Sequence, residues 1–431
     1  MTEVAARVGP FPGYRYVVVG LLAVAYTFNF LDRQLISVLA EPIREDLGLT
    51  DTQLGLLGGI FFAAFYTTFG IPVGYLADRT RRIWIISGGC ALWSLFTALC
   101  GSASSFLQLA LFRMGVGIGE AGGSPPSHSL ISDYFRPEER GTALALFSLG
   151  IPVGSMFGIA LGGWIAAEYG WRMAFVAMGV PGILLAAVLL LFVREPPRGG
   201  LDPPVVGATR QGAPPAFLAV IAGYFSDRTL VLTALALGLS AIVAYGVSSW
   251  AAPFLMRTKG MSLTEVAAYY GLIVGVTGII GTFGAGWLVD RLARLDRRWF
   301  AWLPALGFAL TLPAWVGLMW APNWQLALIF LAVPALLNHS ALAPALAVVQ
   351  NKVAPNRRTV SSAILMFFLN LMGLGIGPIY VGGISDWARP TYGDQSLTVG
   401  LGALIPIVVM AVAAHLLAAQ SIGRDQKDAL A

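Results

Sequence analysis

The chain has 431 residues, of which 57% are apolar and only 11% are charged, and its formal net charge is +5. Because soluble domains carry about 25% charged residues, this composition excludes a soluble enzyme, a nucleic-acid-binding protein and a disordered chain. Most of the chain must therefore have lipid as its solvent.

Twelve mostly apolar runs are long enough to cross a bilayer, which takes about 20 helical residues. The first six lie at 16–40, 53–77, 83–101, 104–131, 140–167 and 172–193, and the other six lie at 229–256, 263–289, 299–320, 324–350, 359–385 and 396–420. This pattern predicts an all-α membrane protein with 12 transmembrane helices in two pseudo-symmetric six-helix bundles.

The longest polar stretch, Arg194–Arg228, separates the two groups of runs. Its proline pairs at 196–197, 203–204 and 214–215 are typical of a linker, with room for a short surface helix. We therefore expect an N-terminal six-helix bundle at 1–194, a cytoplasmic linker at 195–228 and a C-terminal six-helix bundle at 229–431.

Basic residues are distributed unevenly among the loops. Twenty lie on the side of the N-terminus, and five lie on the opposite side: Arg44, Arg172, Arg257, Lys259 and Arg389. Since loops in the cytoplasm carry the excess of Lys and Arg, we expect a multi-pass protein of the cell membrane with both termini in the cytoplasm.

The sequence shows no pattern typical of a cofactor or of an enzyme. Cys90 and Cys100 lie within one apolar run and are interpreted as packing residues, and the three histidines do not have metal-ligand spacing. A membrane enzyme would need a nucleophile or metal set, and an ATP-driven pump would need a phosphate-binding loop. We expect neither, although a sensor that binds without transporting would share the remaining motifs.

A short pattern occurs once in each half of the chain. Gly74-x-x-x-Asp78-Arg79 closes the second run, and Gly286-x-x-x-Asp290-Arg291 closes the second run of the other group. This internal repeat is typical of a pseudo-symmetric transporter. Gly74 would permit a close helix contact, and Asp78 would lie at a helix terminus or pair with Arg79 or with a basic residue of a neighbouring span. We predict a conformational latch made of Gly74, Asp78, Arg79, Arg82, Asp290 and Arg291.

Four ionisable residues lie well inside the apolar runs: Asp32, Arg33, Arg113 and Glu120. A charge at membrane depth costs at least about 2.5–3.5 kcal/mol, so such residues are rarely unpaired. Arg113 and Glu120 are seven residues apart and share one helix face. We predict that Asp32, Glu120 and Arg113 couple transport to protons. A static ion network is the alternative, and Arg33, on another face from Asp32, could be a structural partner only.

The fifth run carries a glycine at every fourth position: Gly150, Gly154, Gly158 and Gly162. Such a stripe permits close helix packing, and we interpret it as the moving seam between the two bundles. Simple tight packing is the alternative.

Polar residues at membrane depth in the second half are mostly neutral. One charged wall opposite a largely apolar one suits a substrate with a polar head and an apolar tail. The predicted substrate contacts are Arg113, Asn29, Asn338, His339, Tyr245 and Asn370.

The motifs resemble those of the major facilitator superfamily. Gly74-x-x-x-Asp78-Arg79-x-Arg81-Arg82 is similar to its signature loop, and Arg113-x-x-x-Gly117-x-x-x-Ala121-x-x-x-Pro125 is similar to its fourth-span motif, with Ala121 where a glycine is usual. Asn29-Phe30-Leu31-Asp32-Arg33, together with Arg113 and Glu120, resembles the spinster family of lipid transporters. Similar first-span stretches occur in superfamily members that import sugar acids.

The resemblance implies a secondary active transporter that works by alternating access. It implies proton-coupled transport of a lysophospholipid or a sphingosine-phosphate-like lipid; the alternative is a proton-coupled symporter of small organic anions such as sugar acids. The expected partners are the bilayer and a lipid or amphipathic small molecule, with no nucleic acid. We expect protons as the coupling ion, no other cofactor, and a monomer.

Overall fold

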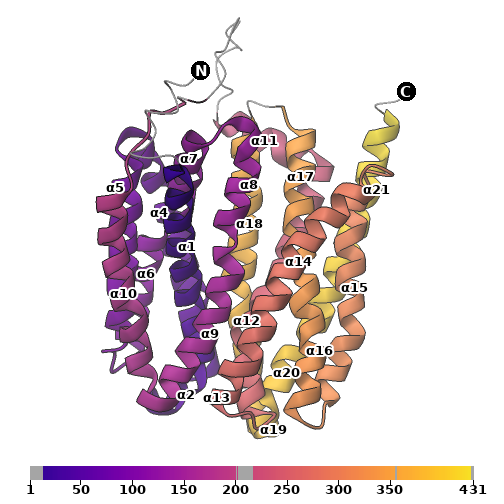
Figure 1. Cartoon of the computed structure of the whole chain (residues 1–431). Helices are drawn as coiled ribbons and strands as arrows, with labels where there is room; N and C mark the ends of the chain where they lie inside the picture. The colour runs from indigo at the N-terminus through magenta and orange to yellow at the C-terminus, as the bar shows by residue number, and fades with distance from the viewer. Residues whose placement is uncertain (1–12, 200, 202–216, 355–356, 429–431) are drawn as a thin grey trace, which may run out of the picture. The chain divides into compact units, whose positions relative to one another are not determined.

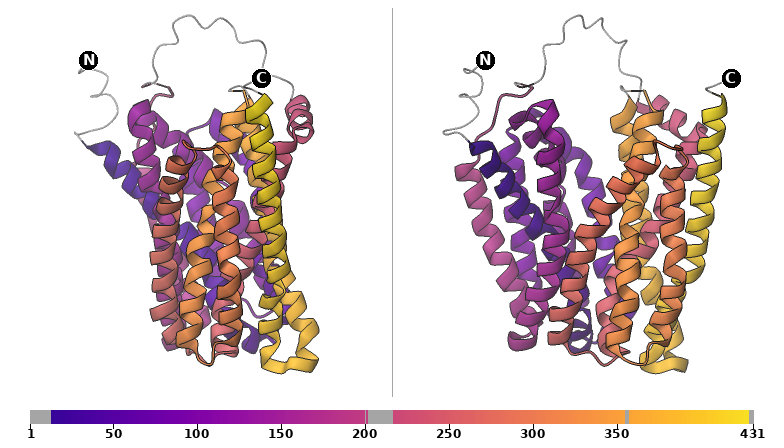
Figure 2. Two further views of the ribbon diagram at one scale, coloured as in Figure 1. Left: turned by 90° about the vertical axis from the view of Figure 1, so that its right-hand side faces the viewer. Right: turned by 45° about the vertical axis from the view of Figure 1, so that its right-hand side comes forward.

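A computed structural model describes residues 13–199, 201, 217–354 and 357–428. Four features used in the predictions lie outside these residues. They are Arg7 and Arg210, which are two of the twenty basic residues counted on the side of the N-terminus, and the proline pairs at 203–204 and 214–215. Figures 1 and 2 show that the described part consists of helices that run side by side within each unit.

The first half of the chain forms ten helices among the described residues. They are α1 (Tyr14–Val38), α2 (Ala40–Leu47), α3 (Asp51–Gly58), α4 (Ile60–Arg79), α5 (Arg82–Cys100), α6 (Phe106–Glu120), α7 (Ser124–Tyr134), α8 (Pro137–Ser148), α9 (Gly150–Tyr169) and α10 (Trp171–Phe192).

The second half begins with α11 (Phe217–Ser226), which is the short helix expected in the linker, and α12 (Arg228–Arg257). Then come α13 (Leu263–Glu265), η2 (Val266–Tyr270), α14 (Gly271–Leu292), α15 (Trp299–Trp320), α16 (Trp324–Leu337), η3 (Asn338–Ser340) and α17 (Leu342–Lys352). The last elements are α18 (Arg358–Phe368), η5 (Leu369–Ile376), α19 (Gly377–Tyr392), η6 (Gly393–Gln395), α20 (Ser396–Gly402) and α21 (Leu404–Asp428). Of these, η2 and η5 are π-helical, and η3 and η6 are 3₁₀ turns.

Each of the twelve predicted runs is helical over most of its length, and ten stretches of the described residues are long and apolar enough to cross a membrane. The run at 104–131 is absent from those ten because a turn at 121–123 divides it into α6 and α7. The last two runs are counted together, because 360–426 is one apolar stretch. The described architecture is all-α because each apolar run is long enough to cross the membrane as a helix.

The chain divides by its contacts into two compact units. The first consists of Met1–Leu49, Phe61–Gly207 and Leu263–Gly275, and the second consists of Thr50–Ile60, Ala208–Ser262 and Val276–Ala431. Each unit therefore contains one short segment from the other half of the sequence. The division into bundles at 1–194 and 229–431 stays a prediction.

The glycine stripe of α9 packs against α1 within the first unit. A Cβ atom at Gly154 would lie 2.3 Å from the backbone oxygen of Thr27, and one at Gly158 would lie 2.6 Å from that of Leu31. The stripe is therefore a tight contact inside one unit, which corrects its interpretation as a moving seam between the halves. Gly150 and Gly162 also approach α1.

A neighbouring face of α9 meets the segment that comes from the second half. A Cβ atom at Gly163 would lie 3.0 Å from the Cβ of Ala267, and one at Gly275 would lie 2.6 Å from the sulfur of Met156. Small residues thus let the backbones approach closely at this contact also.

Gly154→Ala is expected to destabilise the protein by about 1–3 kcal/mol, because its methyl group would collide with the α1 backbone. The measurement is the thermal unfolding temperature of purified protein. Gly74→Ala is the matched control, since a Cβ at Gly74 would meet no atom within 4 Å. Equal unfolding temperatures for the two variants would contradict the tight α1–α9 contact.

Candidate functional site

The four ionisable residues predicted from the apolar runs come from two helices of the first unit. Asp32 and Arg33 lie on α1, and Arg113 and Glu120 lie on α6. Asp32, Arg113 and Glu120 are each only 1% exposed. Glu120 is the last residue of α6, at the point where the turn at 121–123 interrupts the span.

The two carboxylates have different direct partners. Arg33 Nε donates to Glu120 Oε2 at 2.7 Å, and Thr97 Oγ1 on α5 donates to Asp32 Oδ2 at 2.9 Å. Arg113 acts electrostatically on both carboxylates. The structure thus brings Asp32, Arg113 and Glu120 together. The structure also makes Arg33 the ion-pair partner of Glu120. Arg33 was expected on another face of α1 because it is adjacent to Asp32, but its long side chain extends to Glu120 on α6.

Aromatic rings surround the two guanidinium groups. The Arg33 guanidinium carbon lies 4.8 Å from the ring centre of Phe30, 4.9 Å from that of Phe62 and 5.1 Å from that of Tyr66. The Arg113 guanidinium lies 5.4 Å from the same Phe62 ring. These faces exclude water while attracting the cations.

The cluster, defined as Asp32, Arg33, Arg113 and Glu120, has two acids and two bases, so its net charge is zero when all four are ionised. Asp32 Oδ1 and Glu120 Oε1 are buried and have no hydrogen-bond partner among the described residues. Of the two carboxylates, Glu120 also interacts with the Asn29 side chain, so Asp32 Oδ1 is the oxygen that can take a proton without disturbing a neighbouring donor. The contacts of Thr97 and of the Phe62 ring could not be predicted, because neither residue type is unusual in an apolar run.

The predicted substrate contacts of the second half lie at two interruptions of regular helix. Asn338 and His339 are in the 3₁₀ turn between α16 and α17, where His339 Nδ1 lies 3.3 Å from Thr282 Oγ1 of α14. Asn370 is in the π-helical segment η5, and a Cβ at Gly373 in that segment would lie 2.7 Å from the Tyr245 ring of α12. Such interruptions are frequent at functional sites.

Asn29 lies one turn before Asp32 on α1 and is 3% exposed. It lines a small cavity of the first unit together with Trp93 and Ser127. This is the same side of α1 that carries the cluster, since Asp32 and Asn29 are three residues apart.

The predicted latch has a different set of contacts from those expected. Arg82 is 2% exposed, and it donates from Nε to Glu195 at 2.7 Å and from Nη1 to Asp133 at 2.5 Å. Asp78 is exposed and forms no ion pair among the described residues. Its predicted pairing with Arg79 is wrong for this structure, because the Arg79 guanidinium lies on the Tyr75 ring, 3.5 Å from its centre.

The beginning of the linker binds the signature loop. Arg198 donates to the backbone oxygens of Ala77, Asp78 and Thr80, at 2.7 Å for the first and last, and so satisfies carbonyl groups at the end of α4. Gly74 does not make the close helix contact expected of it, since the space beside it is open.

The second copy of the repeat has the same local arrangement. The Arg291 guanidinium lies 4.5 Å from the ring centre of Trp287, four residues earlier, as Arg79 does with Tyr75. Asp290 is exposed. The internal repeat is therefore visible in side-chain packing as well as in sequence.

Comparison with known proteins identifies the family. The model of the Major Facilitator Superfamily matches residues 22–378. The chain belongs to this superfamily. This confirms the resemblance that the signature loop and the fourth-span motif indicated.

Several known proteins are similar to this chain over most of its length. An MFS-type efflux pump of Mycolicibacterium smegmatis is 38% identical over 92% of this chain and 90% of that protein. Human protein spinster homolog 1 is 29% identical over 90% of this chain and 76% of that protein. A hexuronate transporter of Bacillus subtilis is 26% identical over 91% of this chain and 93% of that protein.

A solved structure is similar over almost the whole length. It is the crystal structure of a bacterial homolog of the human lysosomal transporter spinster, in an inward-facing and unoccupied conformation. It matches with a TM-score of 0.87 and 32% identity, and the match covers 97% of this chain and 99% of that chain. The chain is thus a superfamily transporter of the spinster type, and the predicted all-α fold is confirmed.

This superfamily transporter also has a buried ionic cluster in its second unit that the sequence did not reveal. Arg257 donates to both oxygens of Asp51, at 2.7 and 2.8 Å, and Ser385 donates to Asp51 Oδ2 at 2.7 Å. Asp386 accepts from the backbone nitrogens of Asp51 and Thr52, at 3.0 and 2.7 Å. These bonds fix the N-terminus of α3, a helix from the first half, on residues of the second half.

The only sequence signal near this cluster was local. Thr50 and Gln53 form a capping box, with Gln53 N donating to Thr50 Oγ1 and Thr50 N donating to Gln53 Oε1, which marks the start of α3. The close contact of α3 with α19 depends on glycine. A Cβ at Gly55 would lie 2.7 Å from the backbone oxygen of Pro378, and one at Gly382 would lie 2.4 Å from the backbone oxygen of Asp51.

Arg257→Gln is expected to lower stability by about 3–5 kcal/mol, because it leaves the fully buried Asp51 carboxylate without its cation. Arg172→Gln is the matched control, since both side chains of the Arg172–Asp46 pair are 44% exposed and such pairs contribute about 0–1 kcal/mol. Thermal unfolding of the purified variants is the measurement. A loss for Arg257→Gln no larger than that of the control would contradict this assignment.

Proposed function

We propose that this transporter is proton-coupled, works by alternating access, and moves an amphipathic lipid of the lysophospholipid or sphingosine-phosphate type across the membrane. The observation that carries the proposal is the buried, charge-balanced cluster of Asp32, Arg33, Arg113 and Glu120. Buried ion pairs stabilise a fold poorly compared with apolar packing, so their presence at membrane depth favours a functional reason.

Proton coupling follows from the charge balance of the cluster. One proton taken up by Asp32 or Glu120 leaves the cluster with one net positive charge. An anionic headgroup can then balance that charge at Arg113, through hydrogen bonds of the guanidinium to phosphate or carboxylate oxygens. Loss of the proton restores the internal pairing and weakens the hold on the substrate.

The substrate class is supported by the contrast between the two halves. The candidate contacts of the second half include no Asp, Glu, Lys or Arg, and they lie among apolar residues in the sequence. They are Asn338, His339, Tyr245 and Asn370. Such a wall suits an acyl or sphingoid chain. The likeness to spinster proteins supports a lipid substrate, and the name of the efflux pump supports export. The hexuronate transporter supports the alternative, a proton-coupled symporter of small organic anions.

In proteoliposomes with an imposed pH gradient, we expect flux of a radiolabelled lysophospholipid, measured by extraction with albumin from the outer leaflet, and no flux of glucuronate. Asp32→Asn should abolish the response to the pH gradient, because an amide cannot exchange a proton. Asp46→Asn is the matched control, since this carboxylate is largely exposed and lies outside the cluster.

Arg113→Ala should remove substrate flux in the same assay while the protein still assembles. A full pH response in Asp32→Asn would refute the coupling role of Asp32. Glucuronate flux with no lysophospholipid flux would favour the organic-anion symporter instead.

We further propose that the transporter is a monomer of the cell membrane with both termini in the cytoplasm and with protons as its only coupling species. The distribution of the loop arginines and lysines between the two sides supports the orientation.

Single cysteines test this orientation, since the native Cys90 and Cys100 are both buried. Glu45, whose side chain is 69% exposed, and Arg294, which is also exposed, lie in loops predicted to face opposite sides. Glu45→Cys should react with a membrane-impermeant maleimide on intact cells, and Arg294→Cys should react only after permeabilisation. The reverse result would invert the topology.

A further inference from the structure

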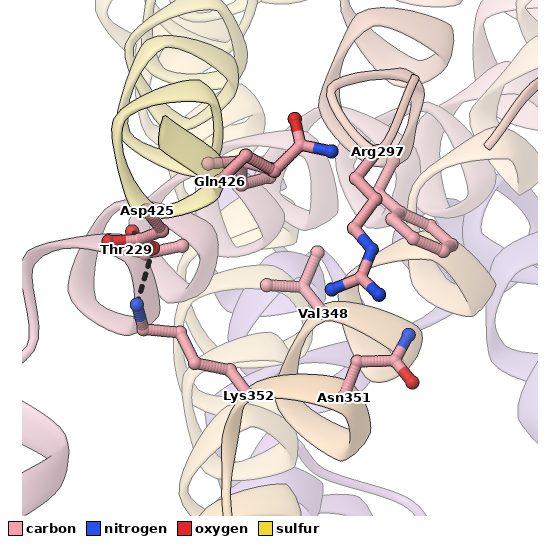
Figure 3. Close-up of a pocket in the computed structure, with 9 residues that line it drawn as sticks. Thr229, Arg297, Val348, Asn351, Lys352, Asp425 and Gln426 are labelled. Carbon is pink, nitrogen blue, oxygen red and sulfur yellow. Dashed lines mark hydrogen bonds and ion pairs between the residues drawn. The ribbon is translucent and has the colours of Figure 1, made fainter. Parts of the chain in front are cut away.

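The second unit has a pocket of about 450 Å³ that none of the functional residues above lines. It lies where α12 and α15 begin and where α17 and α21 end, as Figure 3 shows in close-up. In the orientation proposed above, this end of the unit is the cytoplasmic one.

Part of the pocket wall is apolar. Phe300 of α15, Val348 of α17 and Ile422 of α21 line it, and Val348 and Ile422 belong to a buried hydrophobic cluster against which Phe300 packs. A ligand that fills the pocket therefore meets carbon as well as polar atoms.

The charge of Lys352 is compensated within the protein. Its amino group pairs with Asp425, and with Asp227 at 3.2 Å, while Thr229 Oγ1 donates to Asp425 Oδ2 at 2.7 Å. Figure 3 shows this pair on one side of the pocket. Two carboxylates on one ammonium give this side of the pocket a net charge of −1, so Lys352 is not available to an anionic ligand.

Arg297 is in the opposite situation. Its side chain is exposed and forms no hydrogen bond or ion pair with the described residues, whereas the adjacent Arg298 is bound to Asp296 at 2.8 Å. That hydrogen bond from Arg298 holds the pKa of Asp296 below its usual value, so Asp296 remains the partner of Arg298. Figure 3 shows the Arg297 guanidinium directed into the pocket, on the side of the Asn351 and Gln426 side chains.

The pocket therefore offers one cation without an internal partner, two amide groups and an apolar wall, while the Asp425 carboxylate on its other side is held by Lys352 and Thr229. One guanidinium with two donors in a plane matches a phosphate group that carries a single negative charge. The amides can bond ester or hydroxyl oxygens, and the apolar wall can hold the first carbons of a chain. Basic pockets between helices at the cytoplasmic end of a membrane protein are suited to phospholipid headgroups.

We propose that this pocket binds the phosphodiester headgroup of an anionic phospholipid from the cytoplasmic leaflet, with Arg297 as the phosphate ligand. A soluble phosphate ester has the same phosphate chemistry, but it would leave the apolar wall unfilled. The proposal is independent of the transported substrate, because it concerns a different unit and different residues from the cluster.

The test is native mass spectrometry of the full chain in detergent, titrated with phosphatidylglycerol or with phosphatidylcholine of the same acyl chains. Arg297→Gln is expected to weaken phosphatidylglycerol binding about tenfold, as for the loss of one charge-assisted hydrogen bond. Binding of phosphatidylcholine, which has no net charge, should not change. Arg294→Gln is the matched control, because Arg294 is exposed on the same loop and does not line the pocket.

Two further measurements use the Arg297→Lys variant and competition by glycerol 3-phosphate. The lysine variant keeps the charge but loses the planar pair of donors, so we expect intermediate binding; an unfolding temperature equal to that of the natural protein shows that the fold is kept. Equal phosphatidylglycerol binding by Arg297→Gln and Arg294→Gln would overturn the proposal. Displacement of the lipid by glycerol 3-phosphate at millimolar concentration would overturn the assignment to a lipid and indicate a soluble ester.

Discussion

The cost of placing charge in hydrocarbon is the constraint on which this structure depends. Asp32, Glu120 and Arg113 have lost almost all contact with water. The protein offsets that cost by gathering opposite charges and by covering the guanidinium groups with aromatic faces. Because the balance is internal, adding or removing one proton changes the net charge of the whole group, and the proposed function rests on that change.

A second constraint of the lipid solvent applies wherever regular helix is interrupted. α6 stops at Glu120, and the second half breaks at Asn338–Ser340 and widens at Leu369–Ile376. Backbone groups freed at these points must find partners inside the protein, because lipid offers none. The polar side chains that we assign to transport therefore lie beside irregular backbone, within units that are otherwise closely packed through glycine contacts.

The sequence predicted the helices well, because run length and hydropathy reflect the bilayer directly. It also predicted that Asp32, Arg113 and Glu120 lie together, since a charge in an apolar run needs a partner. It could not predict the reach of Arg33 to Glu120, or the binding of Arg82 to Asp133 and Glu195, because long side chains choose partners in three dimensions. The glycine stripe indicated a close contact correctly, but periodicity carries no information on which helix lies opposite, and the partner is α1.

The ionic bond between Asp51 and its partners has a consequence for how the chain is made. Asp51 and Asp386 are 335 residues apart, so at 5–20 residues per second a ribosome needs roughly 20 to 70 s to deliver the second after the first. Arg257 follows Asp51 by 206 residues and so becomes available earlier, whereas the backbone nitrogens of Asp51 and Thr52 lack their Asp386 acceptor until the later part of synthesis. The contacts that fix the N-terminus of α3 therefore become complete only when Asp386, near the end of the chain, has been synthesised.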